Sequence, residues 1–156
     1  MSLSAPVATA VRGTGFRLGL VAARFNPALV DGLLARVLAR LRSAGVREAD
    51  LAVVRVPGSH EVPWAAQRLA VTGRRDCVIG LGVLIAGDTN HHELVADSVS
   101  HALQRVSLAT GVPVINGVMA VGTPAQARAR CLGRINRGAE FAAAALEMAA
   151  LKRTLS

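Results

Sequence analysis

The segment from Gly82 to Glu93 combines an apolar stretch, a glycine and a histidine in an order that could support proton transfer beside an anion. It opens with residues typical of a buried strand, breaks at Gly87 and continues as a polar stretch that can start a helix. A strand that leads through a glycine turn into a helix N-terminus surrounds an anion with free backbone N–H groups. His91 would lie in the first helical turn, where the helix dipole favours the neutral imidazole, a group that can accept and donate a proton near neutral pH.

Two other roles compete with this one. His91 could serve only to cap its helix. With Asp88, His92 and Glu93 it could also suggest a metal site, but adjacent histidines point to different sides of a helix, so we expect no metal here. The proton-transfer role therefore depends on whether other elements complete a pocket around His91.

Composition places the 156-residue chain among globular proteins of one domain. It is 52% hydrophobic and only 3% aromatic, without tyrosine, which indicates an aliphatic, alanine-rich core. No apolar run approaches the roughly twenty residues of a membrane span, and residues 1–10 lack a signal-peptide pattern. We therefore expect a soluble cytoplasmic protein with no membrane partner, in which Cys77 and Cys131 are reduced.

The formal net charge of +8 raises the question of nucleic-acid binding, because every basic residue except Lys152 is an arginine. The arginines, however, are spread over several expected helices, and few aromatic residues exist to stack on bases. A phosphorylated small-molecule substrate explains part of the charge, and we expect it in preference to nucleic acid.

Apolar strands alternate with amphipathic helices along the chain, which predicts a parallel sheet with helices on both faces. Residues 1–15 read as an N-terminal arm and residues 16–156 as a single α/β domain. Strands are expected at 16–23, 51–56, 77–85 and 112–121, and helices at 27–44, 62–72, 91–110, 124–131 and 138–153.

Helix-start and helix-stop signals frame these helices. Asn26 precedes Pro27 as an expected N-cap, and Asn90 with Glu93 has the spacing of a capping box. Glycines that follow the helices are expected stops, at Gly45, Gly73 and Gly111.

Unusual residues follow the strands. In parallel sheets, ligands bind beyond the carboxyl ends of the strands, where the strand order reverses. The segments found there are 24–26, 57–61 and 87–92, together with Asn116. One pocket could therefore hold an aromatic face, a carboxylate, an anion nest and a histidine.

The order and spacing of these motifs resemble the lumazine synthase (6,7-dimethyl-8-ribityllumazine synthase) family from about Phe16 to Leu151. The matching motifs are Arg24-Phe25-Asn26; Val56-Pro57-Gly58-x-x-Glu61-x-Pro63; Leu81-Gly82-Val83-x-Ile85-x-Gly87-x-Thr89-x-His91; Gly111-Val112-Pro113-Val114-Ile115-x-Gly117; Gln126-Ala127; Arg130; Asn136-x-Gly138; and Ala145-x-Glu147-Met148-Ala149. Single short motifs have many false matches, but their joint order is very specific.

The resemblance implies a flavodoxin-like three-layer αβα sandwich with a four-stranded parallel sheet. It also implies a transferase of riboflavin biosynthesis that uses no cofactor. The family condenses 5-amino-6-(D-ribitylamino)uracil with 3,4-dihydroxy-2-butanone 4-phosphate, releasing phosphate and water, in the penultimate step of that pathway.

The resemblance also implies residue roles around the phosphorylated substrate. His91 would shuttle protons during imine formation and phosphate loss. Gly87, Asp88 and Thr89 would form the phosphate nest, and Arg130 of a neighbouring subunit would clamp the phosphate.

On the pyrimidine side, Phe25 would stack on the ring with Asn26 beside it, and Glu61 would accept hydrogen bonds from ribityl hydroxyls. Asn116 would come from the neighbouring subunit, and Arg137 matches a position where the family often has a lysine near the pyrimidine. Further substrate-binding positions are expected at Ser59, His60, Val83, Leu84 and Ile85.

A site shared between subunits implies a homo-oligomer, either a pentamer or a shell of about 60 subunits built from pentamers. The N-terminal arm could pair with a neighbouring subunit. The connection from Arg130 to Gly138 lacks residues often found where shell formation is blocked, which favours the shell.

Four positions depart from the family pattern and make the site more polar. His60 and His92 stand where aromatic or other apolar residues are usual, Ala86 replaces a frequent arginine, and Asn116 replaces a phenylalanine. The alternative hypothesis is therefore a non-catalytic, shell-forming paralogue that binds a flavin or lumazine.

Overall fold

Four parallel strands form one sheet in the computed structural model, which describes residues 4–72 and 74–156. The strands are β1 (Leu18–Ala23), β2 (Leu51–Val56), β3 (Cys77–Ile85) and β4 (Val114–Val121). The helices are α1 (Pro27–Ser43), α2 (Val62–Thr72), α3 (His91–Thr110), α4 (Pro124–Cys131) and α5 (Arg137–Thr154), with short 3₁₀ helices η1 (Glu48–Asp50) and η2 (Ser59–Glu61).

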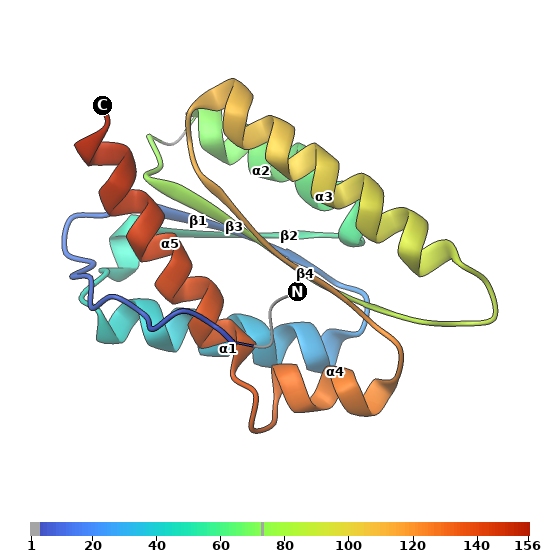
Figure 1. Ribbon diagram of the computed structural model, residues 1–156. Helices are drawn as coiled ribbons and strands as arrows, with labels where there is room; N and C mark the ends of the chain where they lie inside the picture. The colour runs from blue at the N-terminus through green and yellow to red at the C-terminus, as the bar shows by residue number, and fades with distance from the viewer. Residues whose placement is uncertain (1–3, 73) are drawn as a thin grey trace.

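The strands lie in the order β2-β1-β3-β4, and all neighbouring pairs are parallel. Helices α1, α4 and α5 cover one face of the sheet, and α2 and α3 cover the other (Figure 1). The three-layer αβα prediction is therefore confirmed. After β1 the chain adds β2 on one side of β1 and then β3 on its other side. The strand order therefore reverses between β1 and β3.

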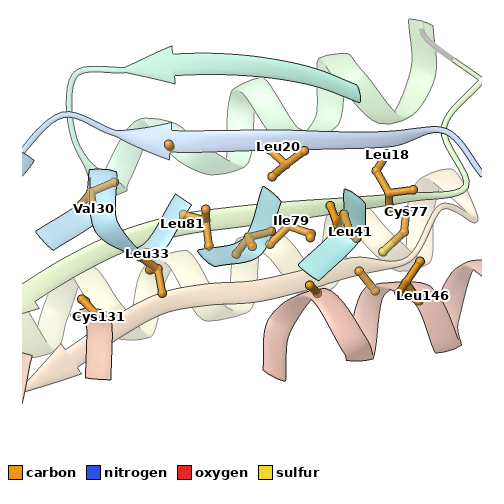
Figure 2. Close-up of a cluster of buried hydrophobic side chains, with 14 of the residues drawn as sticks. Leu18, Leu20, Val30, Leu33, Leu41, Cys77, Ile79, Leu81, Cys131 and Leu146 are labelled. Atoms are coloured by element: carbon orange, nitrogen blue, oxygen red, sulfur yellow. The ribbon is translucent and has the colours of Figure 1, made fainter. Parts of the chain in front are cut away.

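Two apolar clusters hold the layers together. The larger lies between the sheet and α1, α4 and α5, where Figure 2 labels Leu18, Leu20, Val30, Leu33, Leu41, Cys77, Ile79, Leu81, Cys131 and Leu146. Small side chains on α5, such as Ala142, Ala145 and Ala149, are fully buried and let this helix approach the sheet closely. The second cluster joins the opposite face to α2 and α3 and includes Val62, Val99 and Leu103.

The predicted strand ends differ from the observed ones at two N-termini. β1 begins at Leu18 and not at Phe16, because the Arg17 N–H donates to the Asp76 carboxylate instead of to a neighbouring strand. β4 begins at Val114, because Pro113 has no N–H and the Val112 N–H donates to Thr110 Oγ1.

The capping predictions are confirmed only in part. Gly111 ends α3 as predicted, with a φ of 73°. Thr123, directly before the helix predicted at 124–131, caps α4 through a hydrogen bond from the Gln126 N–H. Asn26 and Asn90 stand at N-cap positions but neither side chain caps its helix, so the capping box predicted at Asn90 and Glu93 is wrong. The stop predicted at Gly73 lies outside the described residues.

The N-terminal arm runs along its own chain. The Thr9 N–H donates to Glu147 Oε1 of α5 over 2.9 Å, and the Gly13 N–H donates to the Ala44 carbonyl at the end of α1 over 2.7 Å. Figure 1 shows this segment passing over the layer of α1 and α5. Its pairing with a neighbouring subunit stays a prediction.

The Asp76 carboxylate, directly before β3, links the start of β1 to helix α5 at the amino end of the strands. Asp76 Oδ2 accepts from the Arg17 N–H (2.7 Å) and from Arg153 Nη2 (2.8 Å), and Asp76 Oδ1 accepts from Arg153 Nε (2.9 Å). Burial opposes ionisation of Asp76, but these hydrogen bonds and the charges of Arg153 and Lys152 outweigh it and lower the pKa of Asp76. The ionised carboxylate therefore stabilises the folded state.

We expect Asp76→Asn to lower the free energy of unfolding by about 2–3 kcal/mol near neutral pH, because a neutral amide cannot replace a charged carboxylate that accepts three hydrogen bonds. A group whose pKa is lower in the folded state stabilises the fold above its unfolded pKa of about 3.9, and this contribution disappears as the pH falls through the folded value. Urea unfolding at neutral pH and in acid measures the difference. If the free energies of unfolding of wild type and variant differed by the same amount at both pH values, this role would be contradicted.

Among the helices of the described residues, none is long and apolar enough to span a membrane. Cys77 and Cys131 are both buried and unpaired, and burial raises the pKa of the Cys77 thiol to about 12. The two thiols thus act as core residues.

Candidate active site

A cavity of about 700 Å³ opens at the carboxyl edge of the sheet, beside the ends of β1, β2 and β3. It lies where the strand order reverses, the position favoured for ligands in this class of sheet. Its lining residues are Phe25, Asn26, Gly58, Ser59, His60, Glu61, Val83, Leu84, Ile85, Gly87, Thr89, His91, His92, Leu94, Val95 and Ser98.

The end of β1 is held in an unusual backbone conformation. Asn26 has a φ of 54° and a ψ of 57°, a left-handed conformation that asparagine tolerates better than most residues. Its Nδ2 donates to the Val83 carbonyl of β3 over 2.8 Å, which explains why the side chain does not cap α1. This bond fixes the turn that presents Phe25, whose side chain is 70% exposed.

The turn after β2 brings a carboxylate next to this ring. The Gly58 N–H donates to Glu61 Oε2 over 2.9 Å. A Cβ atom at Gly58 would lie 3.1 Å from both Glu61 Oε2 and Phe25 Cδ2, so a larger residue here would push one of these side chains away by a few tenths of an ångström. Glu61 keeps its second oxygen, Oε1, available to accept hydrogen bonds from a ligand.

Ser59 is the buried member of the same turn, with 5% of its surface exposed. It packs against β3 at Gly82, where any added Cβ atom would collide with the Ser59 hydroxyl. The glycine in β3 therefore makes room for η2 to lie close to the sheet.

The segment after β3 leads into α3 without a side-chain cap. Thr89 Oγ1 accepts a long hydrogen bond of 3.4 Å from the His91 N–H, and a Cβ atom at Gly87 would meet nothing within 4 Å. The positive end of the α3 dipole therefore lies beside the cavity, and the Asn90 side chain does not cap it. The His91 side chain lines the cavity and is exposed, with no hydrogen bond to the described chain.

Four predicted site residues lie outside this cavity. Asp88 is exposed in the turn but is not part of the lining. Asn116 Oδ1 accepts from the Val118 N–H, Arg130 Nη1 donates to the Gln126 carbonyl, and Arg137 pairs with Glu140 over 2.6 Å. Helices α4 and α5 lie on the opposite side of the sheet from α3 (Figure 1), so one chain alone does not bring these arginines to His91.

Comparison with known proteins places this site in a family. The family model described as 6,7-dimethyl-8-ribityllumazine synthase matches residues 15–153. The chain belongs to the lumazine synthase family. The match contains every lining residue of the cavity.

Curated relatives carry the same printed name, 6,7-dimethyl-8-ribityllumazine synthase. The protein from Thermococcus gammatolerans is 46% identical, with 92% of each chain covered. That from Halorhodospira halophila is 46% identical over 89% of this chain and 90% of its own. That from Xanthomonas euvesicatoria pv. vesicatoria is 43% identical over 93% and 95%. The similarity therefore spans nearly the whole length on both sides.

Sequence reasoning missed three cavity residues of α3. Leu94, Val95 and Ser98 follow His91 at spacings of three, four and seven residues, so they lie on the same helix face. That helical spacing was the available signal, because it predicts that the face bearing His91 continues along the cavity.

Within residues 4–72 and 74–156, no group of three or more histidine, cysteine, aspartate or glutamate side chains is placed to hold a metal ion. His91 and His92 point into different surroundings, the first exposed and the second largely buried.

Proposed function

We propose that this protein is a 6,7-dimethyl-8-ribityllumazine synthase. It condenses 5-amino-6-(D-ribitylamino)uracil with 3,4-dihydroxy-2-butanone 4-phosphate in riboflavin biosynthesis. The observation that carries this proposal is the cavity lined by Phe25, Glu61 and His91 together, within the part of the chain that the family model matches. The catalytic names of the relatives favour this function over a non-catalytic shell protein.

The pyrimidine would stack on the exposed face of Phe25, since an aromatic ring held at a fixed turn offers a flat apolar surface. Glu61 Oε2 is already bonded to the Gly58 N–H, which orients the carboxylate. Its free oxygen accepts hydrogen bonds from the ribityl hydroxyls, and bonds to an ionised acceptor are the stronger kind.

The phosphate would bind at the N-terminus of α3, against the Gly87 and Thr89 turn. A leaving phosphate needs a fixed positive field, which the helix N-terminus and one arginine provide together. We assign that arginine to Arg130 of a neighbouring subunit, because helix α4, which carries Arg130, lies on the opposite face of the sheet from α3 in its own chain.

His91 would move the protons. The 5-amino group of the pyrimidine attacks the ketone carbon, and loss of water gives an imine. Removal of the neighbouring C–H proton then expels phosphate and leaves an enol, which takes up a proton at the terminal carbon and becomes a ketone. The ribitylamino nitrogen attacks this ketone, and loss of a second water closes the ring. Holding the two reactants together supplies much of the rate, so one imidazole that takes and returns protons is sufficient.

We expect His91→Ala to lower kcat by about 10- to 100-fold while the KM of each substrate changes by less than about threefold. The imidazole makes no hydrogen bond to the described chain, so its loss should not disturb the fold. Steady-state kinetics measures both parameters. A large rise in either KM at constant kcat would show that His91 binds substrate instead of transferring protons.

A turnover assay with the two substrates tests the proposed function. The protein should release phosphate and form the lumazine faster than the spontaneous reaction, as followed by absorbance and fluorescence. Binding of the lumazine without any turnover, by folded protein, would instead establish the non-catalytic alternative.

We also propose that the protein acts in the cytoplasm as a pentamer, alone or as a unit of a closed shell, with its N-terminal arm contacting a neighbour. Large apolar side chains are exposed on β2, α2 and α3, at Val53, Trp64, Val71, Leu94 and Leu108. Light scattering should give five times the chain mass or the mass of a shell. A monomer at micromolar concentration would contradict this assembly.

A further inference from the structure

His92 is a polar residue in an apolar place. It lies on the face of α3 that continues with Val95 and Val99, the face turned toward the core. Its side chain is only 18% exposed, and His92 is nevertheless one of the residues that line the cavity.

One nitrogen of this ring lacks a partner. His92 Nδ1 is buried and makes no hydrogen bond; Arg75 Nε is the only other such side-chain atom among the described residues. Nε2 lies 4.0 Å from Glu93 Oε1, beyond hydrogen-bond distance, and that carboxylate is largely exposed. An unpaired buried nitrogen destabilises the fold, and a phenyl ring of similar size would avoid this cost.

The surroundings indicate what the missing partner is. Ser59 and Glu61 of η2, which packs against α3, line the same cavity. A hydroxyl, a carboxylate and an imidazole together suit a ligand chain whose groups both donate and accept hydrogen bonds. An anion would be repelled here by Glu61, whereas a polyol would not.

We propose that His92 is a positioning residue that recognises a hydroxyl group of the ribityl chain, on the wall that it forms with Ser59 and Glu61. A turn of the imidazole about its soft terminal torsion, or one ordered water, connects the buried nitrogen to the ligand. This inference rests on the proposed function, since it assigns a residue to one part of that substrate.

The test compares two ligands that share a ring and differ in the chain. They are 6,7-dimethyl-8-ribityllumazine and 6,7,8-trimethyllumazine, in which a methyl group replaces the ribityl chain. The Kd of trimethyllumazine divided by the Kd of ribityllumazine, both measured by fluorescence titration, isolates the contribution of the ribityl hydroxyls to binding. In His92→Phe we expect this ratio to shrink by about 5- to 10-fold, because one hydrogen bond contributes about 1 kcal/mol.

Two further variants separate recognition from packing. His92→Asn keeps a polar group near the position of Nδ1 and should retain most of the preference for the ribityl ligand. His101→Phe is the matched control, since His101 is an exposed residue of the same helix that pairs with Asp97 at 3.4 Å, and the ratio should not change. The melting temperature of His92→Phe should equal or exceed that of the wild type, because the unpaired nitrogen is gone.

An unchanged ratio in His92→Phe would overturn the inference, even if the wild type turns over its substrates. A smaller ratio in His92→Phe with no turnover by the wild type would support the inference and contradict the proposed function. The binding experiment thus distinguishes the two failures.

Discussion

Replacing Arg130 with alanine should lower kcat/KM for the butanone phosphate by about 100-fold and leave the KM of the pyrimidine within about twofold. Among the described residues, Arg130 bonds only to a carbonyl of its own helix, the Gln126 C=O, so most of its guanidinium donors are available to a ligand. Two charge-assisted hydrogen bonds to a phosphate are together worth about 3 kcal/mol, which corresponds to the expected loss.

Two variants sharpen this prediction. Arg130→Lys keeps the charge but loses the two-pronged geometry and should lie between wild type and alanine. Arg128→Ala removes an exposed arginine of the same helix and should leave both substrates unaffected. Steady-state kinetics with each substrate varied in turn measures these effects. Equal losses for both substrates would show that Arg130 supports the structure of the site instead of holding the phosphate.

The second large effect is on stability, at the contact of α5 with α1. A Cβ atom at Gly138 would lie 2.6 Å from Arg36 Cβ and 2.8 Å from the Leu33 carbonyl oxygen. Neither the α1 backbone nor a Cβ atom can move aside, so Gly138→Ala must push the helices apart. We expect the free energy of unfolding to fall by about 2–3 kcal/mol, although alanine alone would favour a helix by about 1 kcal/mol over glycine.

Chemical denaturation measures this change, with Gly122→Ala as the control. A Cβ atom at Gly122 would meet only Gln126 Oε1, at 3.4 Å, so that variant should differ little from the wild type. A Gly138→Ala protein as stable as the wild type would show that α1 and α5 can separate without cost.

Local sequence patterns were sufficient to predict most of the helices and strands. The boundaries of β2, α2, β3 and α3 agree with the prediction, because each of these elements is a continuous apolar or amphipathic run with a proline, glycine or polar residue at its limits. One of the errors occurs where a residue distant in the sequence sets the boundary. β1 starts late because Asp76 takes the Arg17 N–H, and that contact joins residues far apart in the sequence.

The candidate site could likewise be predicted from the sequence only in part. The strand-end segments could be predicted to converge, since parallel strands share one carboxyl edge. The left-handed turn at Asn26 could not, because it depends on a hydrogen bond to Val83 on another strand. The unpaired Nδ1 of His92 depends likewise on the packing of α3, and the sequence alone marks only its departure from an apolar pattern.

A mixing experiment tests most directly the claim that lumazine is made in a cavity completed by a neighbouring subunit. His91→Ala and Arg130→Ala chains are each expected to keep at most about a tenth of the wild-type activity. When equal amounts are unfolded and refolded together, about a quarter of the sites should combine an intact His91 with an intact Arg130 from the next subunit. Lumazine formation by the mixed protein should therefore recover to about a quarter of the wild-type activity. Activity that stays at the mean of the two separate variants would contradict this claim.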